Sequence, residues 1–362
     1  MRGYLIVFIF FLRFVTASGQ DLDTLLGSIL RIENPKQRVE ELFRYGYYLL
    51  DKDPKLAYEY VRNCEAAAKE SRSLYALSKS NNLSGQFFCN QGNYKKALDH
   101  FEKYMSVSKE LNDTLLLAYA STNLGNVYLR LNQFQKAERY FLSAIEFYNF
   151  LHSDIELANG LINLGTLNHT QGQLDAALNN YEKALDIGKK LNEYDIRAIC
   201  LNNIAQVFSD KGDLEKALAY NYDALELRDL MGSDIDVSDS YLSIAEVALK
   251  QSNIELAEEN LDLAIALCNK LDYDEGKMTY HQLASELYAK KGNYQLAYEH
   301  LKQAAELKDN LLAMQDEEPA DITEEEAVVV QHTKHGVTGW WLLITLALLL
   351  IIIPFILFRY KR

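Results

Sequence analysis

The sequence predicts an all-α protein built as a solenoid of helical hairpins. Only four prolines and seventeen glycines occur in 362 residues, beside abundant Leu, Ala, Glu and Lys, and this composition suits long helices joined by short turns. A residue that favours a turn also recurs five positions before six of the seven repeat alanines. These alanines form a series with a fixed step of forty residues: Ala57, Ala97, Ala137, Ala177, Ala217, Ala257 and Ala297. A fixed period of this length indicates stacked repeats.

Each repeat contains a small residue and a large one at fixed distances from its alanine. Twelve residues before the alanine stand Gly85, Gly125, Gly165, Ala205, Ala245 and Ser285. Four residues after it stand Val61, Phe101, Phe141, Tyr181, Leu261 and Leu301. We expect the small residues to let two helices approach closely, and the large ones to fill the core at helical spacing.

Two breaks divide each repeat into a first helix and a second, antiparallel helix. The first break falls at residues that mostly tolerate a left-handed backbone, Gly92, Asn132, Gly172, Gly212, Ser252 and Gly292. Capping residues follow it at Asn93, Asp213, Asn253 and Asn293. The second break follows Leu111, Leu151, Leu191, Met231 and Leu271. We expect the second helix to be the longer one.

Strings such as TNLGNVYLRLNQFQKAERYFLSAIEFY and NNIAQVFSDKGDLEKALAYNYDALEL resemble tetratricopeptide (TPR) repeats. The resemblance covers most of the chain and implies a right-handed superhelix of about seven hairpins. The usual unit has about 34 residues, and longer units resemble the extracytoplasmic TPR arrays of bacterial membrane sensors and regulators. Tyr104 and Asn221 depart from the pattern, and Tyr45 and Gly46 put the first unit one residue out of phase. We expect local distortion at these positions and an atypical, capping first unit.

The chain divides into five predicted segments. Residues 1–19 have the pattern of a secretory signal peptide, and residues 20–313 hold the repeats. An acidic juxtamembrane linker occupies 314–338. Residues 339–358 contain no charge, and at about 1.5 Å per residue they match a bilayer core of about 30 Å, so they are predicted to form a transmembrane helix. A basic tail, 359–362, ends the chain.

Basic residues near the predicted span set its orientation. Arg359, Lys361 and Arg362 follow the span, whereas only Lys334 lies shortly before it, so the C-terminus is predicted to be cytoplasmic. An export signal requires the same topology. We therefore expect the repeats to lie outside the cytoplasm, in the periplasm or at the cell surface.

The resemblance implies that the first helix of each hairpin lines a concave groove. Asn123, Asn163 and Asn203 recur there at equal positions, and their carboxamides could form a ladder along an extended peptide backbone. Alternatively, these asparagines bond only to neighbouring backbone. The other predicted groove residues make the groove polar in its earlier repeats and acidic in its later ones. They are Asn82, Gln86, Asn126, Asn202, Gln206, Glu246, Gln282 and Glu286.

The sequence predicts no enzyme and no cofactor, because it contains no phosphate-binding glycine loop, no GxSxG and no HExxH motif. His332 and His335 form the tightest histidine pair, without a nearby cysteine, so no metal site is predicted. Cys64 and Cys89 lie on neighbouring predicted helices and are the one pair that could form a disulfide in an exported domain. A formal charge of −14 argues against nucleic acid as a partner.

We therefore expect a single-pass membrane scaffold or sensor ectodomain that binds a peptide or protein. After the span only four residues follow, so any signal would pass to a membrane partner through the transmembrane helix. Two alternatives stay open. One is a tail-anchored cytosolic adaptor, and the other is an accessory subunit of an envelope assembly.

Overall fold

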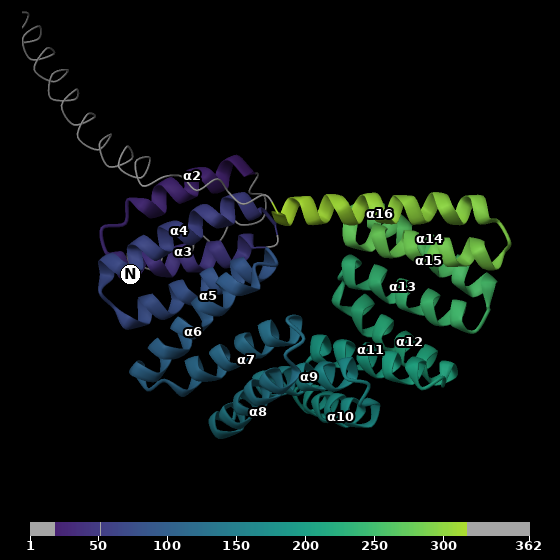
Figure 1. Cartoon of the computed structure of the whole chain (residues 1–362), viewed down its shortest axis with the longest axis horizontal. Helices are drawn as coiled ribbons and strands as arrows, with labels where there is room; N and C mark the ends of the chain where they lie inside the picture. The colour runs from purple at the N-terminus through teal and green to yellow at the C-terminus, as the bar shows by residue number, and fades with distance from the viewer. Residues whose placement is uncertain (1–18, 51, 317–362) are drawn as a thin grey trace, which may run out of the picture. The chain divides into compact units, whose positions relative to one another are not determined.

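The computed structural model describes residues 19–50 and 52–316, and within these residues every regular element is a helix (Figure 1). There are fifteen helices, and thirteen of them, from α4 to α16, repeat the same spacing. Their bounds are α2 Gly19–Leu30, α3 Pro35–Leu49, α4 Pro54–Ser71, α5 Leu74–Asn90, α6 Tyr94–Leu111, α7 Thr114–Arg130, α8 Phe134–Leu151, α9 Asp154–Thr170, α10 Leu174–Leu191, α11 Tyr194–Asp210, α12 Leu214–Met231, α13 Asp234–Lys250, α14 Ile254–Leu271, α15 Asp274–Lys290 and α16 Tyr294–Asp316.

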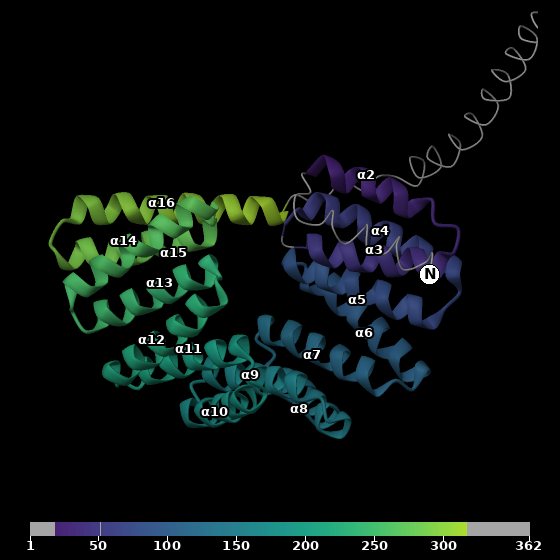
Figure 2. The same cartoon turned by 180° about the vertical axis from the view of Figure 1, so that it is seen from behind.

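Helices α3 to α16 pair into seven consecutive hairpins, which confirms the predicted repeat solenoid (Figures 1 and 2). The odd-numbered helix of each hairpin is its first helix, and the even-numbered helix is its second. Consecutive first helices contact one another directly, whereas each second helix packs mainly on the first helices before and after it. The first helices therefore form the inner layer of the array.

The tight turn inside each hairpin is built by three residues, and Gln91, Gly92 and Asn93 illustrate it. Gly92 has a φ of +69°, and the amide of Asn93 donates to the carbonyl of Phe88 at 2.8 Å, which satisfies the open end of α5. The side chain of Asn93 then accepts from the amide of Lys96 and caps α6. All six predicted first breaks have positive φ, which confirms the prediction.

The second break of each repeat also uses a left-handed residue. Asn112, His152, Asn192, Gly232 and Asp272 follow the predicted helix ends directly and have φ between 52° and 70°. The second helix is the longer one, as expected, but only by a single residue: α6 has 18 residues and α5 has 17. The extra residues of the forty-residue unit are therefore shared between both helices.

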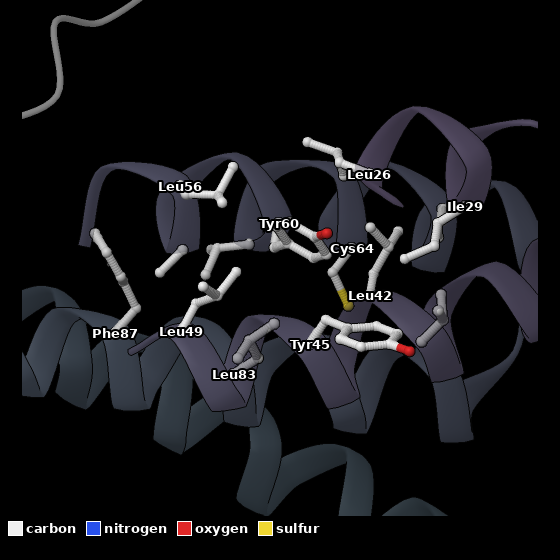
Figure 3. Packing of buried hydrophobic residues seen from close by; sticks show 14 of the residues in the cluster. Leu26, Ile29, Leu42, Tyr45, Leu49, Leu56, Tyr60, Cys64, Leu83 and Phe87 are labelled. Carbon is white, nitrogen blue, oxygen red and sulfur yellow. The ribbon is translucent and has the colours of Figure 1, made fainter. Parts of the chain in front are cut away.

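The core runs through the array between the two layers. All seven repeat alanines are buried, because they lie where a second helix presses on its neighbours. In the first hairpins Leu42, Tyr45, Tyr60 and Cys64 pack together between α3 and α4 (Figure 3), with the two tyrosine rings 6.5 Å apart. Leu301, in the last hairpin, is the exception to the predicted core, because 56% of it is exposed.

The first hairpin differs from the others, as predicted. Helix α3 has 15 residues, two fewer than the first helices that follow, and Gly46 takes the place of the small residue. A Cβ at Gly46 would lie 2.9 Å from Cδ2 of Leu83. An additional helix, α2, packs on α3 and α4 in front of this hairpin.

The distortion expected at Tyr104 and Asn221 is absent from the described helices that carry them. Helices α6 and α12 each keep 18 residues and end at a left-handed residue, as their neighbours do. Both side chains are buried, so the solenoid absorbs an unusual residue by local packing and not by a change of the backbone.

Several predicted segments lie outside the described residues. These are residues 1–18 of the signal peptide, residues 317–338 of the acidic linker, the transmembrane helix at 339–358 and the basic tail. Helix α16 continues to Asp316, three residues beyond the predicted end of the repeats. Among the described helices, none has the length and apolar character needed to cross a membrane.

Candidate functional site: the inner face

The first helices from α5 to α15 each have 17 residues and share one register. Counted from the first residue of each helix, residues 2, 6, 9 and 13 follow helical spacing and lie on one side. Residue 12 lies on another side, against the helix's own second helix, as Gly85 does against Phe101. We call the surface formed by residues 2, 6, 9 and 13 of these six helices the inner face.

A cluster of three carboxamides joins α5 to α7 at the start of this face. Asn123 donates from Nδ2 to Oδ1 of Asn82 at 2.9 Å, and its own Oδ1 accepts from Nε2 of Gln86 at 2.9 Å. All three side chains are partly buried. The amide of Asn123 is therefore engaged inside the protein and holds two first helices together.

Asn163 and Asn203 occupy the register of Asn123 in α9 and α11, which is residue 10, at the border of the inner face. Both are partly buried. Within the described chain, neither side chain has a hydrogen-bond partner, so their amides are free to meet a ligand. The three asparagines predicted to form one ladder are thus of two kinds, one structural and two open.

The remaining predicted amides also lie at the inner face. Asn126 and Asn202 are partly buried, and Oδ1 of Asn202 is enclosed without a hydrogen bond among the described residues. Gln206 donates to one oxygen of Asp210 at 3.0 Å, and the other oxygen lies 2.7 Å from Nε2 of His169. Gln206 therefore takes part in a network that links α9 to α11.

The acidic end of the face carries less net charge than its glutamates suggest. Oε1 of Glu246 lies 2.9 Å from Nζ of Lys250, and Oε1 of Glu286 lies 3.6 Å from Nζ of Lys290. Gln282, which lies between these two glutamates in the sequence, is exposed. Each predicted glutamate is thus partly offset by a lysine one turn later in the same helix.

Asp239, at residue 6 of α13, is a carboxylate of the inner face that we did not predict. Burial raises the pKa of Asp239, while the charge of Arg228 and a 3.5 Å hydrogen bond from the hydroxyl of Tyr273 act in the opposite direction. Arg228 is itself buried and donates instead to Oγ of Ser240 at 2.7 Å. Asp239 is therefore incompletely compensated and could accept a cationic group.

An apolar row also escaped the prediction. Residue 2 of four first helices is a large apolar side chain that remains exposed: Tyr75 at 46%, Leu115 at 38%, Ile155 at 44% and Ile235 at 45%. The row runs through α5, α7 and α9 and resumes in α13, because the same position is Asp195 in α11 and Glu275 in α15. Its signal is present in the sequence, because these residues share the forty-residue step, but the predicted site consisted of polar residues alone.

The first hairpin adds an aromatic surface to the same side. Phe43 and Tyr47 on α3 lie beside Lys79 of α5 in a hollow of about 440 Å³. The ammonium of Lys79 lies 4.9 Å from the centre of the Phe43 ring and 2.7 Å from Oε2 of Glu40. Tyr47 is 50% exposed. The phase shift of the first unit concealed this surface in the sequence.

Metal and thiol chemistry find little support in the described chain. It contains no group of three or more His, Cys, Asp or Glu that could hold a metal ion, and His332 and His335 lie outside it. All four cysteines are free. Burial raises the pKa of Cys64 to about 12, so its thiol is unreactive, and Cys89 belongs to a different core region.

Three solved structures show the same fold at low sequence identity. The apo form of RapI has a TM-score of 0.60 at 12% identity and covers 75% of this chain and 97% of its own. A Rap protein complexed with Competence and Sporulation Factor has a TM-score of 0.57 at 21% identity and covers 77% and 79%. NprR in complex with its cognate peptide NprX has a TM-score of 0.57 at 18% identity and covers 87% and 98%.

Sequence models describe the same repeats. No curated protein matches the chain. Tetratricopeptide repeat models match residues 75–149, 156–229 and 279–311, which together make up half of it. These ranges coincide with hairpins of the array, and the hairpins have the geometry that the repeat predicts. The chain therefore belongs to the tetratricopeptide repeat family.

Proposed function

We propose that this protein is a membrane-anchored interaction module whose inner face binds an extended peptide, either free or as a segment of a partner protein. The apolar row is the observation that carries the proposal. Tyr75, Leu115, Ile155 and Ile235 stay exposed at one register although a solvated helix end gains nothing from large apolar groups. A ligand that covers them would remove this apolar area from water.

Polar groups beside the row suit the backbone of such a ligand. The open amides of Asn163 and Asn203 offer both a donor and an acceptor, as an extended main chain requires. The aromatic hollow at α3 and α5 lies at one end of the array, and Asp239 lies nearer the other. We infer a ligand with apolar side chains along its length and a basic group toward α13.

The comparisons support this reading at the level of the fold. Two of the similar structures are named for complexes, one with Competence and Sporulation Factor and one with the cognate peptide NprX. Those ligands belong to those proteins. They support the proposal because a protein with the same fold is in complex with a ligand in each case.

The membrane anchor is the second part of the proposal. It rests on the uncharged run at 339–358 and on the basic residues after it, with the repeats on the extracytoplasmic side. A tail-anchored cytosolic adaptor and an accessory envelope subunit remain the alternatives. Mass spectrometry of the mature N-terminus distinguishes the tail-anchored cytosolic adaptor from the proposal, because an intact Met1 would contradict a cleaved signal peptide.

Site-specific photocrosslinking tests the inner face. p-Benzoylphenylalanine would replace Tyr75 on the inner face in one variant, and Phe150 on second helix α8 in another. Phe150 is 74% exposed, so both probes replace an accessible aromatic side chain in the full-length, membrane-embedded protein. We expect a discrete adduct from position 75 and none from position 150. Equal labelling at both positions would argue that the inner face is not a dedicated binding surface.

A further inference from the structure

Residue 4 of the first helices points toward the second helix of the preceding hairpin, and most hairpins place an apolar side chain there. Leu77, Leu117, Leu157 and Val237 follow this rule. Three first helices carry a basic residue instead: Arg38, Arg197 and Lys277. A charge in this partly enclosed position needs a partner, because burial of an unpaired polar group is unfavourable.

Two of these basic residues have their partners within the protein. Nη1 of Arg38 lies 2.8 Å from Oε2 of Glu70, and its Nε donates to the carbonyl of Ile32 at 3.0 Å. Nζ of Lys277 lies 2.9 Å from Oδ1 of Asp274. The register therefore accepts a cation when the chain supplies an acceptor.

Arg197 is the exception. Across the described residues it has no ion-pair partner, and its Nε is enclosed without a hydrogen bond. Its guanidinium carbon lies 5.3 Å from the centre of the Tyr194 ring, which leaves the donors free. Gly188 makes room for its stem, because a Cβ there would lie 3.1 Å from Cγ of Arg197. The guanidinium is thus held in place without an ion-pair partner among the described residues.

This guanidinium lines a hollow of about 500 Å³ between α10, α11 and α12. The hollow lies on the side of α11 opposite the inner face. Its apolar floor consists of four buried side chains, Leu185, Leu201, Ile204 and Leu227. Its exposed rim carries four carboxylates and one ammonium group, Glu182, Asp186, Asp223, Glu226 and Lys189. This volume lies within the range of about 300–1,000 Å³ that small-molecule sites occupy.

We propose that this hollow binds a small ampholyte, a free amino acid with an apolar side chain. The ligand's carboxylate would accept from Arg197, its ammonium group would face the rim carboxylates, and its side chain would cover the leucines of the floor. A simple anion would meet the acidic rim, and a simple cation would leave the guanidinium of Arg197 without a counter-ion. Only a ligand with both charges complements both features.

The inference is independent of the peptide site, and binding to the full-length protein in detergent tests it. Isothermal titration calorimetry with L-leucine, N-acetyl-leucine and leucinamide compares an ampholyte with its anionic and cationic halves. We expect L-leucine to bind at least tenfold more tightly than either analogue. No binding of L-leucine, or equally tight binding of N-acetyl-leucine, would overturn the proposal.

Two variants locate the binding. Arg197→Leu introduces the residue that three other repeats carry at this register, so the variant should keep the fold. Its circular dichroism spectrum, compared with that of the unchanged protein, checks this. It should abolish leucine binding. Lys277→Leu removes an ion-paired cation at the same register, away from the hollow, and should leave binding unchanged. Leucine binding retained by Arg197→Leu, or lost equally in both folded variants, would sink the assignment.

Discussion

The ring of Phe101 occupies the space that a side chain on Gly85 would need. A Cβ at Gly85 would lie 2.4 Å from Cε1 of that ring, well inside van der Waals contact. Two residues sixteen positions apart thus fit each other, and Gly125 with Phe141 and Gly165 with Tyr181 repeat the fit. A later repeat has a different pair at these two positions, in which Ala245 replaces the glycine and Leu261 replaces the aromatic residue.

Because of this pairing, we expect Gly125→Ala to destabilise the protein, and we expect a smaller residue in place of Phe141 to restore the stability. The added methyl would lie 2.6 Å from ring atoms of Phe141, and overpacking costs about 1–3 kcal/mol against a gain of about 1 kcal/mol in helix propensity. We expect a net loss of up to about 2 kcal/mol in urea unfolding. Phe141→Leu should suppress this loss in the double variant, and purely additive single effects would contradict the pairing.

Asn221 gives the reverse prediction. Its side chain is buried at the register of Phe141 and Leu261, and it donates to the carbonyl of Ser243 at 3.3 Å. Asn221→Leu recreates the alanine and leucine pair with Ala205, so urea unfolding should show a gain of about 1 kcal/mol. Leu261→Asn, the matched control, should lose about 2–4 kcal/mol. A loss of stability in Asn221→Leu would show that the amide is required.

The backbone of the solenoid was predictable because its signals are local. A glycine or asparagine at a fixed step determines where a helix ends, and no distant residue alters this, so the breaks after Leu111 and before Asn93 lie where the sequence places them. Helix length was less predictable. The period sets only the sum of the two helices, and both share the extra residues.

The inner face was predictable only in part because its contacts join neighbouring repeats. Asn123 bonds to Asn82, 41 residues earlier and one register position away, and no periodic alignment pairs those two. Asn163 has the same register without such a partner, because Thr122 and Asn126 of α7 stand where α5 has Asn82 and Gln86, and neither bonds to it. Equal positions in a repeat therefore do not ensure equal roles.

Two helix starts with the same backbone conformation differ in their capping hydrogen bond. Gln133 begins α8 with φ −90° and ψ 64°, close to the −81° and 67° of Asn93 at the start of α6, but it makes no capping hydrogen bond. Gln133→Asn shortens the side chain by one methylene, so we expect a gain of about 0.5–1 kcal/mol. Asn93→Gln should lose a similar amount. Both are measured by urea unfolding, and equal effects of one sign would refute the capping argument.

The last hairpin should make stability depend on pH. Nδ1 of His281 lies 2.8 Å from Nδ1 of His300, an arrangement that requires at least one neutral ring. Burial lowers the pKa of both histidines, and Glu299 opposes this for His300. The unfolded chain then binds more protons below the ordinary histidine pKa of 6.5, so the free energy of unfolding should fall as pH drops through 6.5.

His281→Asn tests this dependence, because Asn81 opposite His100 provides the same pair in the second hairpin, with 3.3 Å between Oδ1 and Nδ1. We expect the variant to unfold with a flatter pH profile between about pH 7.5 and pH 5.5 in thermal scans, a window of about one pH unit on either side of the histidine pKa. If the variant's stability changed with pH as steeply as that of the unchanged protein, the histidine pair would not control the pH dependence.

The apolar row carries the final prediction. Peptides selected from a random library against the full-length protein in detergent should contain apolar residues, because the row of exposed side chains offers the largest gain from burial on the inner face. Ile155→Asp places a charge in the middle of that row and should weaken their binding at least tenfold, or by about 1.4 kcal/mol. Phe150→Asp places the same charge on the exposed surface of α8 and should leave the affinity unchanged. Both sites are exposed, at 44% and 74%, so neither change should disturb the fold, and a loss confined to Phe150→Asp would move the binding surface to the second helices.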